Sequence, residues 1–172
     1  MPSAVTTVLL MGALVVASAF AYDTEGVKAM CADIELEQCG SESCGFYRLN
    51  ENSCVKILTM QMDFVSAQME CEGLSGELVK VQNEEEYKKL LCMMLRVFPR
   101  RLHYWIGAVR REDGDFYWFD GSGPVKFAPW REFQPDNYDG EEDCVWMISG
   151  TWGPWNDGAC YEASSVACQI AM

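Results

Sequence analysis

Cysteines constrain the fold of this chain more than any other feature of its sequence. Nine cysteines occur among its 172 residues, at positions 31, 39, 44, 54, 71, 92, 144, 160 and 168. Zinc is a poor explanation for them, because no CxxC pair is present and His103 is the only histidine. In a secreted chain the same cysteines predict a disulfide framework. Because nine is an odd number, either one thiol stays unoxidised or one disulfide joins two chains.

The N-terminus indicates which compartment the chain enters. Residues 1–21 carry no charged side chain and centre on an apolar run, and the small residues that end at Ala21 fit signal-peptidase cleavage before Tyr22. A membrane anchor is the competing interpretation, because the run nearly reaches spanning length. The run lacks a basic flank and is diluted by Thr, Ser and Gly, which disfavours an anchor. We therefore predict a signal peptide over 1–21 and a secreted, extracellular protein.

The chain is strongly acidic, with a formal net charge of −13 that removal of the uncharged leader would not change. Such a charge opposes binding to nucleic acid and to anionic lipid. We expect no nucleic-acid partner and no membrane insertion. The acids are concentrated in one stretch, FQPDNYDGEEDC, which contains Asp136, Asp139, Glu141, Glu142 and Asp143.

Hydrophobic patterning predicts an α+β chain with its helices first. Residues 22–43 are acidic with little periodicity, so we expect an N-terminal extension with extra cysteines, followed by one domain over 44–172. Turn residues between Cys44 and Cys54 predict a hairpin closed by its own disulfide. Apolar residues spaced i, i+3, i+4, i+7 predict a helix within 62–71, and Asn83 is a good N-cap for a second helix over 83–96.

The second half of the chain predicts short aromatic strands. They fall at 104–109, 115–119, 144–149 and 164–170, and a brief strand at 77–81 lies between the helices. The connection from about 120 to 143 is long, and long loops in compact domains are commonly functional.

Several motifs, taken in this order and spacing, resemble a C-type lectin-like domain from about Cys44 to the C-terminus. They are Phe64, Ala67 and Cys71 in the first helix, Trp105-Ile106-Gly107, Trp130, Gln134-Pro135-Asp136, Glu142-Asp143-Cys144, Trp155-Asn156-Asp157, Cys160 and Cys168. The resemblance implies a disulfide-stapled fold of two helices with small antiparallel sheets and a long calcium- and sugar-binding loop.

The resemblance also implies three disulfides: Cys71 with Cys168, Cys144 with Cys160, and Cys44 with Cys54. Three cysteines, Cys31, Cys39 and Cys92, then lie outside the family pattern. One hypothesis is that at least one of them links two chains in a disulfide-linked homodimer. The alternative is one extra internal pair together with a buried free thiol.

The family's calcium-binding positions all carry oxygen-bearing side chains in this sequence. By the resemblance the ligands of Ca²⁺ are Gln134, Asp136, Glu142, Asn156 and Asp157. Calcium takes about six to eight oxygen ligands, which carboxylates and amides supply. The resemblance implies a cis bond before Pro135. It also disfavours an auxiliary calcium ion, because Arg110 and Arg111 stand near where an acid is expected. The alternative is an acidic loop that binds nothing.

The same residues indicate that the ligand of the site is a sugar. In the family two vicinal hydroxyls of the sugar bind the calcium while its amide and acid ligands hydrogen-bond those hydroxyls. The order Gln-Pro-Asp resembles galactose-type readers, and Tyr138 stands where such members place an aromatic side chain that stacks on galactose. The alternative for Tyr138 is an ordinary loop tyrosine. The chain is similar to soluble single-domain fish lectins that bind galactose or lactose, which implies agglutination or innate defence.

Other functions fit the sequence less well. No serine or cysteine stands in a recognisable nucleophile setting, and His103 is the only imidazole, so we do not expect an enzyme. A non-sugar role on the same scaffold, such as ice binding or a structural matrix contact, remains the alternative. Ice binding favours a flat, weakly charged surface, which a charge of −13 opposes.

Overall fold

The structure is a computed structural model, and it describes residues 24–40, 44–100, 102–149 and 153–172. The signal peptide predicted over 1–21 lies outside these residues. Within the described ranges, no helix is both long enough and apolar enough to cross a lipid bilayer.

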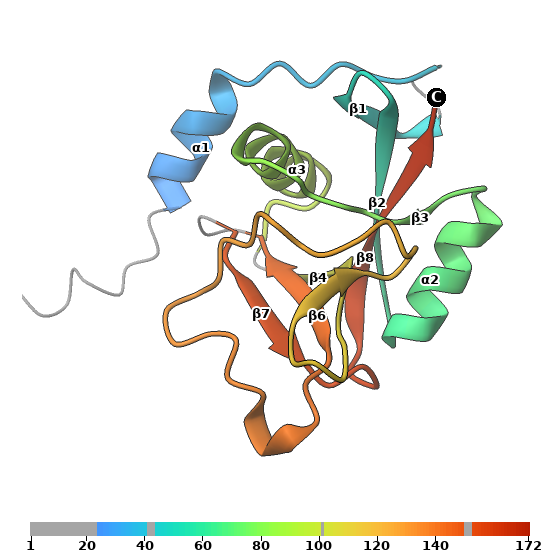
Figure 1. The fold of residues 1–172 in the computed structure, drawn as a ribbon. Helices are drawn as coiled ribbons and strands as arrows, with labels where there is room; N and C mark the ends of the chain where they lie inside the picture. Colours follow the sequence, from blue (N-terminus) through green and yellow to red (C-terminus); the bar gives the residue numbers. More distant parts are fainter. Residues whose placement is uncertain (1–23, 41–43, 101, 150–152) are drawn as a thin grey trace, which may run out of the picture.

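A single sheet of eight strands organises the molecule (Figure 1). Its main path runs β1-β2-β8-β4-β6-β7, with β3 paired to β8 and β5 to β4. The strands are β1 (Phe46–Asn50), β2 (Ser53–Met62), β3 (Glu77–Leu78), β4 (His103–Arg110), β5 (Phe116–Trp118), β6 (Cys144–Ile148), β7 (Trp155–Gly158) and β8 (Ser164–Ala171). The parallel pairing of β4 with β8 joins the antiparallel parts into one sheet. The predicted α+β class is confirmed.

The two predicted helices are present, and their caps explain where they begin. In α2 (Phe64–Gly73) the side chain of Asp63 accepts from the backbone N–H of Ser66. In α3 (Glu84–Val97) the side chain of Asn83 accepts from the backbone N–H of Glu86, as the sequence predicts. Each cap satisfies one of the N–H groups that the first turn of a helix leaves open.

The core forms between these helices and the sheet. Leu90, Leu91 and Met94 of α3 are fully buried, and α2 buries Phe64, Ala67 and Cys71. Among the large side chains, Trp105 of β4 and Trp155 of β7 are completely buried. The core therefore fixes β4, β6 and β7. The long loop leaves β5, which pairs with β4, and returns to β6.

A helix that the sequence pattern does not predict begins the described chain. In α1 (Thr24–Ala32) the side chain of Val27 is fully buried, and Met30 and Cys31 pack against the same core. Cys31 forms a disulfide with Cys92 of α3, and Figure 1 shows α1 beside α3. This part of the acidic extension therefore packs against the lectin-like domain.

Two of the three disulfides implied by the resemblance are present, Cys71–Cys168 and Cys144–Cys160. The expected pairing of Cys44 with Cys54 is wrong, because Cys54 pairs with Cys39. The hairpin register places Cys54 opposite Arg48 rather than Cys44. The segment before the hairpin lies along β1, where Cys39 donates its N–H to the Phe46 carbonyl and comes within 6.3 Å of Cys54 between Cα atoms.

The hypothesis that Cys31, Cys39 or Cys92 links two chains is also wrong, since all three form disulfides within the chain. Their pairing supplies the extra internal disulfide of the alternative interpretation. The thiol outside the four disulfides is Cys44, and it is exposed rather than buried.

Candidate metal and ligand site

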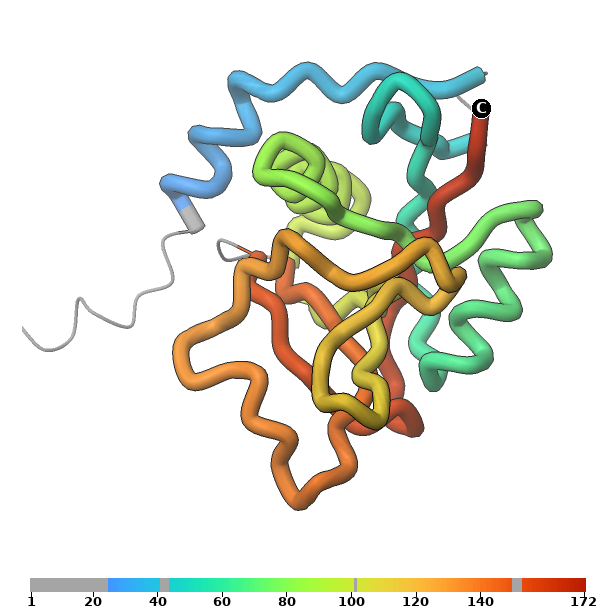
Figure 2. Tube along the Cα trace, in the orientation of Figure 1, coloured from blue at the N-terminus to red at the C-terminus, as the bar shows by residue number. Residues whose placement is uncertain are grey.

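The long loop between β5 and β6 carries the candidate site. Figure 2 shows that this segment, in orange, extends away from the rest of the molecule before it returns to β6. The Gln134–Pro135 bond is cis, as the resemblance implies. Near the tip, the short 3₁₀ helix η2 (Tyr138–Gly140) is entered through Asn137 with a positive φ of 46°. Asparagine tolerates this left-handed conformation better than most residues do.

Three carboxylates meet at the base of the loop. One oxygen from each of Asp136, Glu142 and Asp157 lies within 4.8 Å of the others. Asp136 is exposed, Glu142 is half-buried and Asp157, on β7, is fully buried. The Cys144–Cys160 disulfide ties the start of β6 to the residues just after β7, so it holds the segments that bear Glu142 and Asp157 together.

Backbone N–H groups bind these carboxylates and fix the loop around them. The Asp157 carboxylate accepts from the N–H of Asp136 at 3.2 Å and from that of Asn137 at 2.9 Å. Glu142 Oε2 accepts from the N–H of Tyr138 at 3.0 Å. In return, Asn137 Oδ1 accepts from the N–H of Glu142 at 3.1 Å. The loop is therefore folded around its own acids rather than extended by their repulsion.

The acids create an electrostatic cost that a cation would relieve. Burial raises the pKa of Glu142, and the negative charge of Asp157 and the contact with Asp136 raise it further. Like charges at this separation disfavour simultaneous ionisation. The full set of charges is therefore most stable when a positive ion lies among them.

The two predicted amide ligands also fit a metal. Gln134 Oε1 is buried and has no hydrogen-bond partner among the residues described, a costly state for an amide oxygen. Asn156, buried next to Asp157 on β7, donates its Nδ2 to the Asp157 carbonyl. Oxygen-only ligands with carboxylates in the majority favour calcium over zinc or copper.

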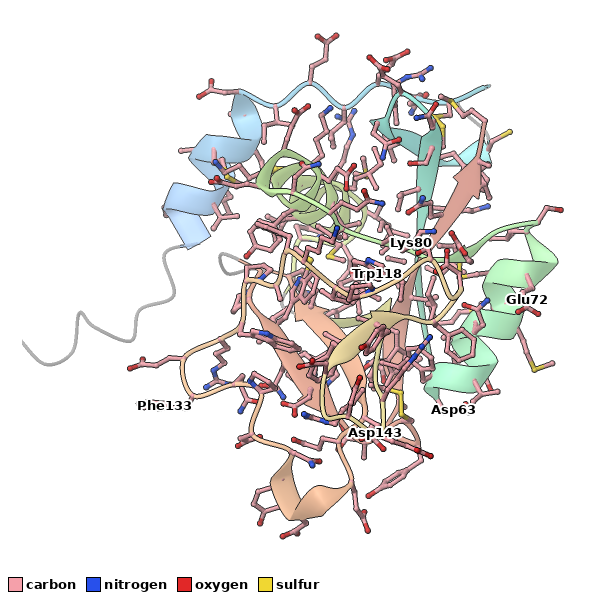
Figure 3. The ribbon with its side chains drawn as sticks, in the orientation of Figure 1. Asp63, Glu72, Lys80, Trp118, Phe133 and Asp143 are labelled. Carbon is pink, nitrogen blue, oxygen red and sulfur yellow. A yellow bond between two sulfur atoms is a disulfide. The ribbon has the colours of Figure 1, made fainter. Side chains whose placement is uncertain are left out.

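Two exposed aromatic side chains on this loop lie close to candidate ligands in the sequence. Tyr138, the predicted stacking residue, is 68% exposed, and its backbone N–H binds the Glu142 carboxylate. Phe133, which the sequence analysis does not single out, is 85% exposed and precedes Gln134. Figure 3 labels Phe133 on the outward arm of the loop and Asp143 where the loop returns to the sheet. No periodicity distinguishes Phe133 in the sequence, because it lies in a loop.

Arg110 is a further residue whose role the sequence analysis underestimates. It ends β4, and its guanidinium forms an ion pair with the buried Asp157. The signal that could have identified it is the basic residue at a position where the resemblance expects an acid.

Comparison with known proteins identifies the family. The family model of the lectin C-type domain matches residues 60–170. The C-type isolectin Sp-CL4 of Scorpaena plumieri is 34% identical over 139 residues, which cover 80% of this chain and 92% of that protein. The chain belongs to the C-type lectin domain family. Members of this family are carbohydrate-binding proteins and not enzymes, in agreement with the sequence analysis.

Other C-type lectins are similar over most of their length. The alpha-N-acetylgalactosamine-specific lectin of Patiria pectinifera is 29% identical over 154 residues, which cover 85% of this chain and 90% of that lectin. Among solved structures, the carbohydrate-recognition domain of the mouse scavenger receptor C-type lectin has a TM-score of 0.65 at 28% identity, covering 77% of this chain and 98% of that one. CEL-I from Cucumaria echinata shares the fold, with a TM-score of 0.69 at 24% identity and coverage of 77% and 97%.

Proposed function

We propose that this C-type lectin is a secreted, calcium-dependent lectin of the galactose type. The observation that carries the proposal is the cluster of Asp136, Glu142 and Asp157, together with the buried Gln134 oxygen, which accepts no hydrogen bond from any described residue. Secretion follows from the predicted signal peptide and agrees with four disulfides. An agglutinating or defensive role is part of the same proposal.

The chain's own residues would hold one calcium ion through Gln134, Asp136, Glu142, Asn156 and Asp157. When bound, the ion would supply open coordination positions for two vicinal sugar hydroxyls. Around those positions Gln134 and Asn156 offer N–H donors, whereas Asp136 and Glu142 offer only acceptors. This order of donors and acceptors selects the hydroxyl geometry, and the exposed ring of Tyr138 offers a face to the C–H side of galactose.

Elution from sugar-coupled resins tests the class of ligand. The refolded, oxidised protein is applied in calcium to galactose resin and to mannose resin, and each is eluted with a chelator or with the free sugar. We expect retention on galactose resin, with release by either agent. Retention that survives the chelator would contradict the calcium mechanism, and equal retention on mannose resin would contradict the galactose selectivity.

Matched loop variants separate the metal from the sugar. Asp136→Asn leaves two of the three carboxylates and should weaken calcium binding by about tenfold or more. Adding Gln134→Glu restores three carboxylates, so the double variant should regain calcium binding but shift its preference toward mannose. Asp139→Asn removes an exposed acid outside the cluster and is the charge-matched control. Calorimetry measures the calcium, and the two resins measure the sugar.

A disulfide-linked homodimer would raise avidity by presenting two sites. It cannot use Cys31, Cys39 or Cys92, which pair within the chain. Gel electrophoresis without reductant, on the natural sequence and on Cys44→Ser, tests the dimer. A dimer band that Cys44→Ser removes would support it, and monomer bands in both would exclude it. Thermal hysteresis, measured on the same material, tests the alternative of ice binding.

A further inference from the structure

Arg110 contacts both segments that carry the candidate metal site, the end of the long loop at Glu142 and the strand β7 at Asp157. It is the last residue of β4, and its backbone N–H donates to the Asp143 carbonyl at 2.7 Å. Its side chain, 14% exposed, lies over the ring of Phe116 at 4.5 Å. The strand and the ring therefore fix the guanidinium before any ligand is present.

The guanidinium contacts both arms of the site. One terminal nitrogen, Nη2, donates to Asp157 Oδ2, and Nε donates to the Glu142 carbonyl at 3.2 Å. Nε also lies 3.6 Å from the Asp143 carboxylate. A planar guanidinium can bridge two acceptors in this way because its N–H groups form a rigid fork, whereas a lysine ammonium is a single point charge.

Asp157 depends on this contact. Its side chain is completely buried, and a buried carboxylate is costly unless it is paired. Arg110 engages Oδ2, and within the described part of the chain the donor to Oδ1 is the N–H of Asp136 at 3.2 Å. A carboxylate oxygen has room for further partners, so Oδ1 remains available to a cation.

We propose that Arg110 is the positioning residue of the metal site. It pairs with Asp157 and orients its carboxylate, and it holds the Glu142–Asp143 arm against β4, so the loop is arranged for calcium before calcium binds. This inference rests on the proposed function for its calcium affinity, but the order of the metal-free loop is independent of it.

Arg110 has two opposing effects on calcium binding, and the larger one decides whether its removal weakens or strengthens that binding. A positive charge close to the site repels a calcium ion, so removing that charge alone would strengthen calcium binding. Loss of positioning would weaken it, because binding would then include the cost of ordering the loop. Positioning is dominant here, because the guanidinium already belongs to an ion pair and its removal leaves the buried carboxylate without this positively charged partner.

The experiment compares Arg110→Gln with Arg111→Gln. Arg111 is the neighbouring arginine, whose side chain lies over Tyr117 at 4.4 Å, so the control removes the same charge from the same region. Amide hydrogen exchange of residues 136–143 is measured in chelator, and calcium affinity is measured by calorimetry. Arg110→Gln should exchange about tenfold faster in this segment and bind calcium about tenfold more weakly. Arg111→Gln should match the natural sequence in both.

Each outcome decides the proposal. Unchanged exchange in Arg110→Gln, or calcium binding as tight as in the natural sequence, would overturn it. Arg110→Lys keeps the charge and replaces the glutamine variant if that variant fails to fold. The lysine variant should still show faster exchange than the natural sequence. Exchange and calcium affinity identical to those of the natural sequence would overturn the bridging role. If the natural sequence binds no calcium, the proposed function fails, whereas the exchange measurements still test Arg110.

Discussion

At the scale of single residues, the charges that would bind a metal ion destabilise the metal-free fold. Glu142 lies next to two other carboxylates, and burial together with their charges raises its pKa. Such a group is harder to ionise in the folded chain than in the unfolded one. Its ionisation therefore destabilises the metal-free fold at neutral pH, while the same charge is needed to bind the ion.

Replacing Glu142 by glutamine should stabilise the metal-free protein. The stability associated with the raised pKa is present below the unfolded value, near 4.5, and is lost as the pH rises through the folded value. In chelator, Glu142→Gln should thus melt above the natural sequence at pH 7.5, by about 2–4 °C for each kcal/mol gained. The difference should diminish as the pH falls to about 4.

Glu141→Gln is the matched control, because Glu141 is exposed and its side chain contacts the Tyr161 hydroxyl rather than the cluster. It should leave the melting temperature unchanged. In calcium the ranking should invert, since only the natural sequence and the control would gain stability from the ion. A glutamine variant that melts lower in chelator at pH 7.5 would show that Glu142 is not electrostatically strained.

At the scale of elements, two of the disulfides stabilise different regions of the molecule. Cys31–Cys92 attaches α1 to α3, and Cys144–Cys160 closes the base of the loop. In the view of Figure 1 these regions lie toward opposite ends of the molecule. The first disulfide therefore contributes to the stability of the fold, and the second contributes also to the geometry of the site.

Paired serine substitutions should separate these contributions. Cys31→Ser/Cys92→Ser opens a link of 61 residues and should cost about 4 kcal/mol, with calcium affinity unchanged. Cys144→Ser/Cys160→Ser opens a link of 16 residues and should cost about 3 kcal/mol. It should also weaken calcium binding by about tenfold. Denaturant unfolding and calorimetry measure the two quantities, and equal calcium affinity in both variants would contradict this division.

The sequence predicts those elements whose local chemistry agrees with their tertiary setting. Asn83 caps a helix both by its side chain and by its place before an apolar stripe, so α3 is recognised at once. The sequence pattern does not predict the helix α1, because its burial depends on few side chains, chiefly Val27, and on a disulfide to a residue far along the chain. The error at Cys54 arises because strand register, which sequence spacing does not reveal, decides which cysteine lies nearby.

At the scale of the whole molecule, the charge of −13 acts on stability together with the site. An excess of one charge destabilises a compact fold through self-repulsion, and any added salt screens part of that repulsion. The candidate ligands could be listed from the sequence, but the ion pair between Arg110 and Asp157 could not, because it joins residues that only the sheet brings together. A response to calcium must therefore be distinguished from general screening.

Thermal melting in calcium and in magnesium at equal ionic strength makes this distinction. An ion that binds only the folded state at 100 times its Kd adds about 2.7 kcal/mol, which corresponds to about 5–10 °C for a chain of this size. Magnesium requires nearly ideal octahedral geometry and gives up its water reluctantly, so it should raise the melting temperature no more than sodium chloride does. Hydrogen exchange should show calcium protection over residues 133–143 and none in α1, which lies beside α3 at the end of the molecule opposite the tip of the loop in the view of Figure 1. Equal shifts in calcium and magnesium would mean that the acids respond only to screening, because a loop that merely carries charge cannot discriminate two ions of the same valence.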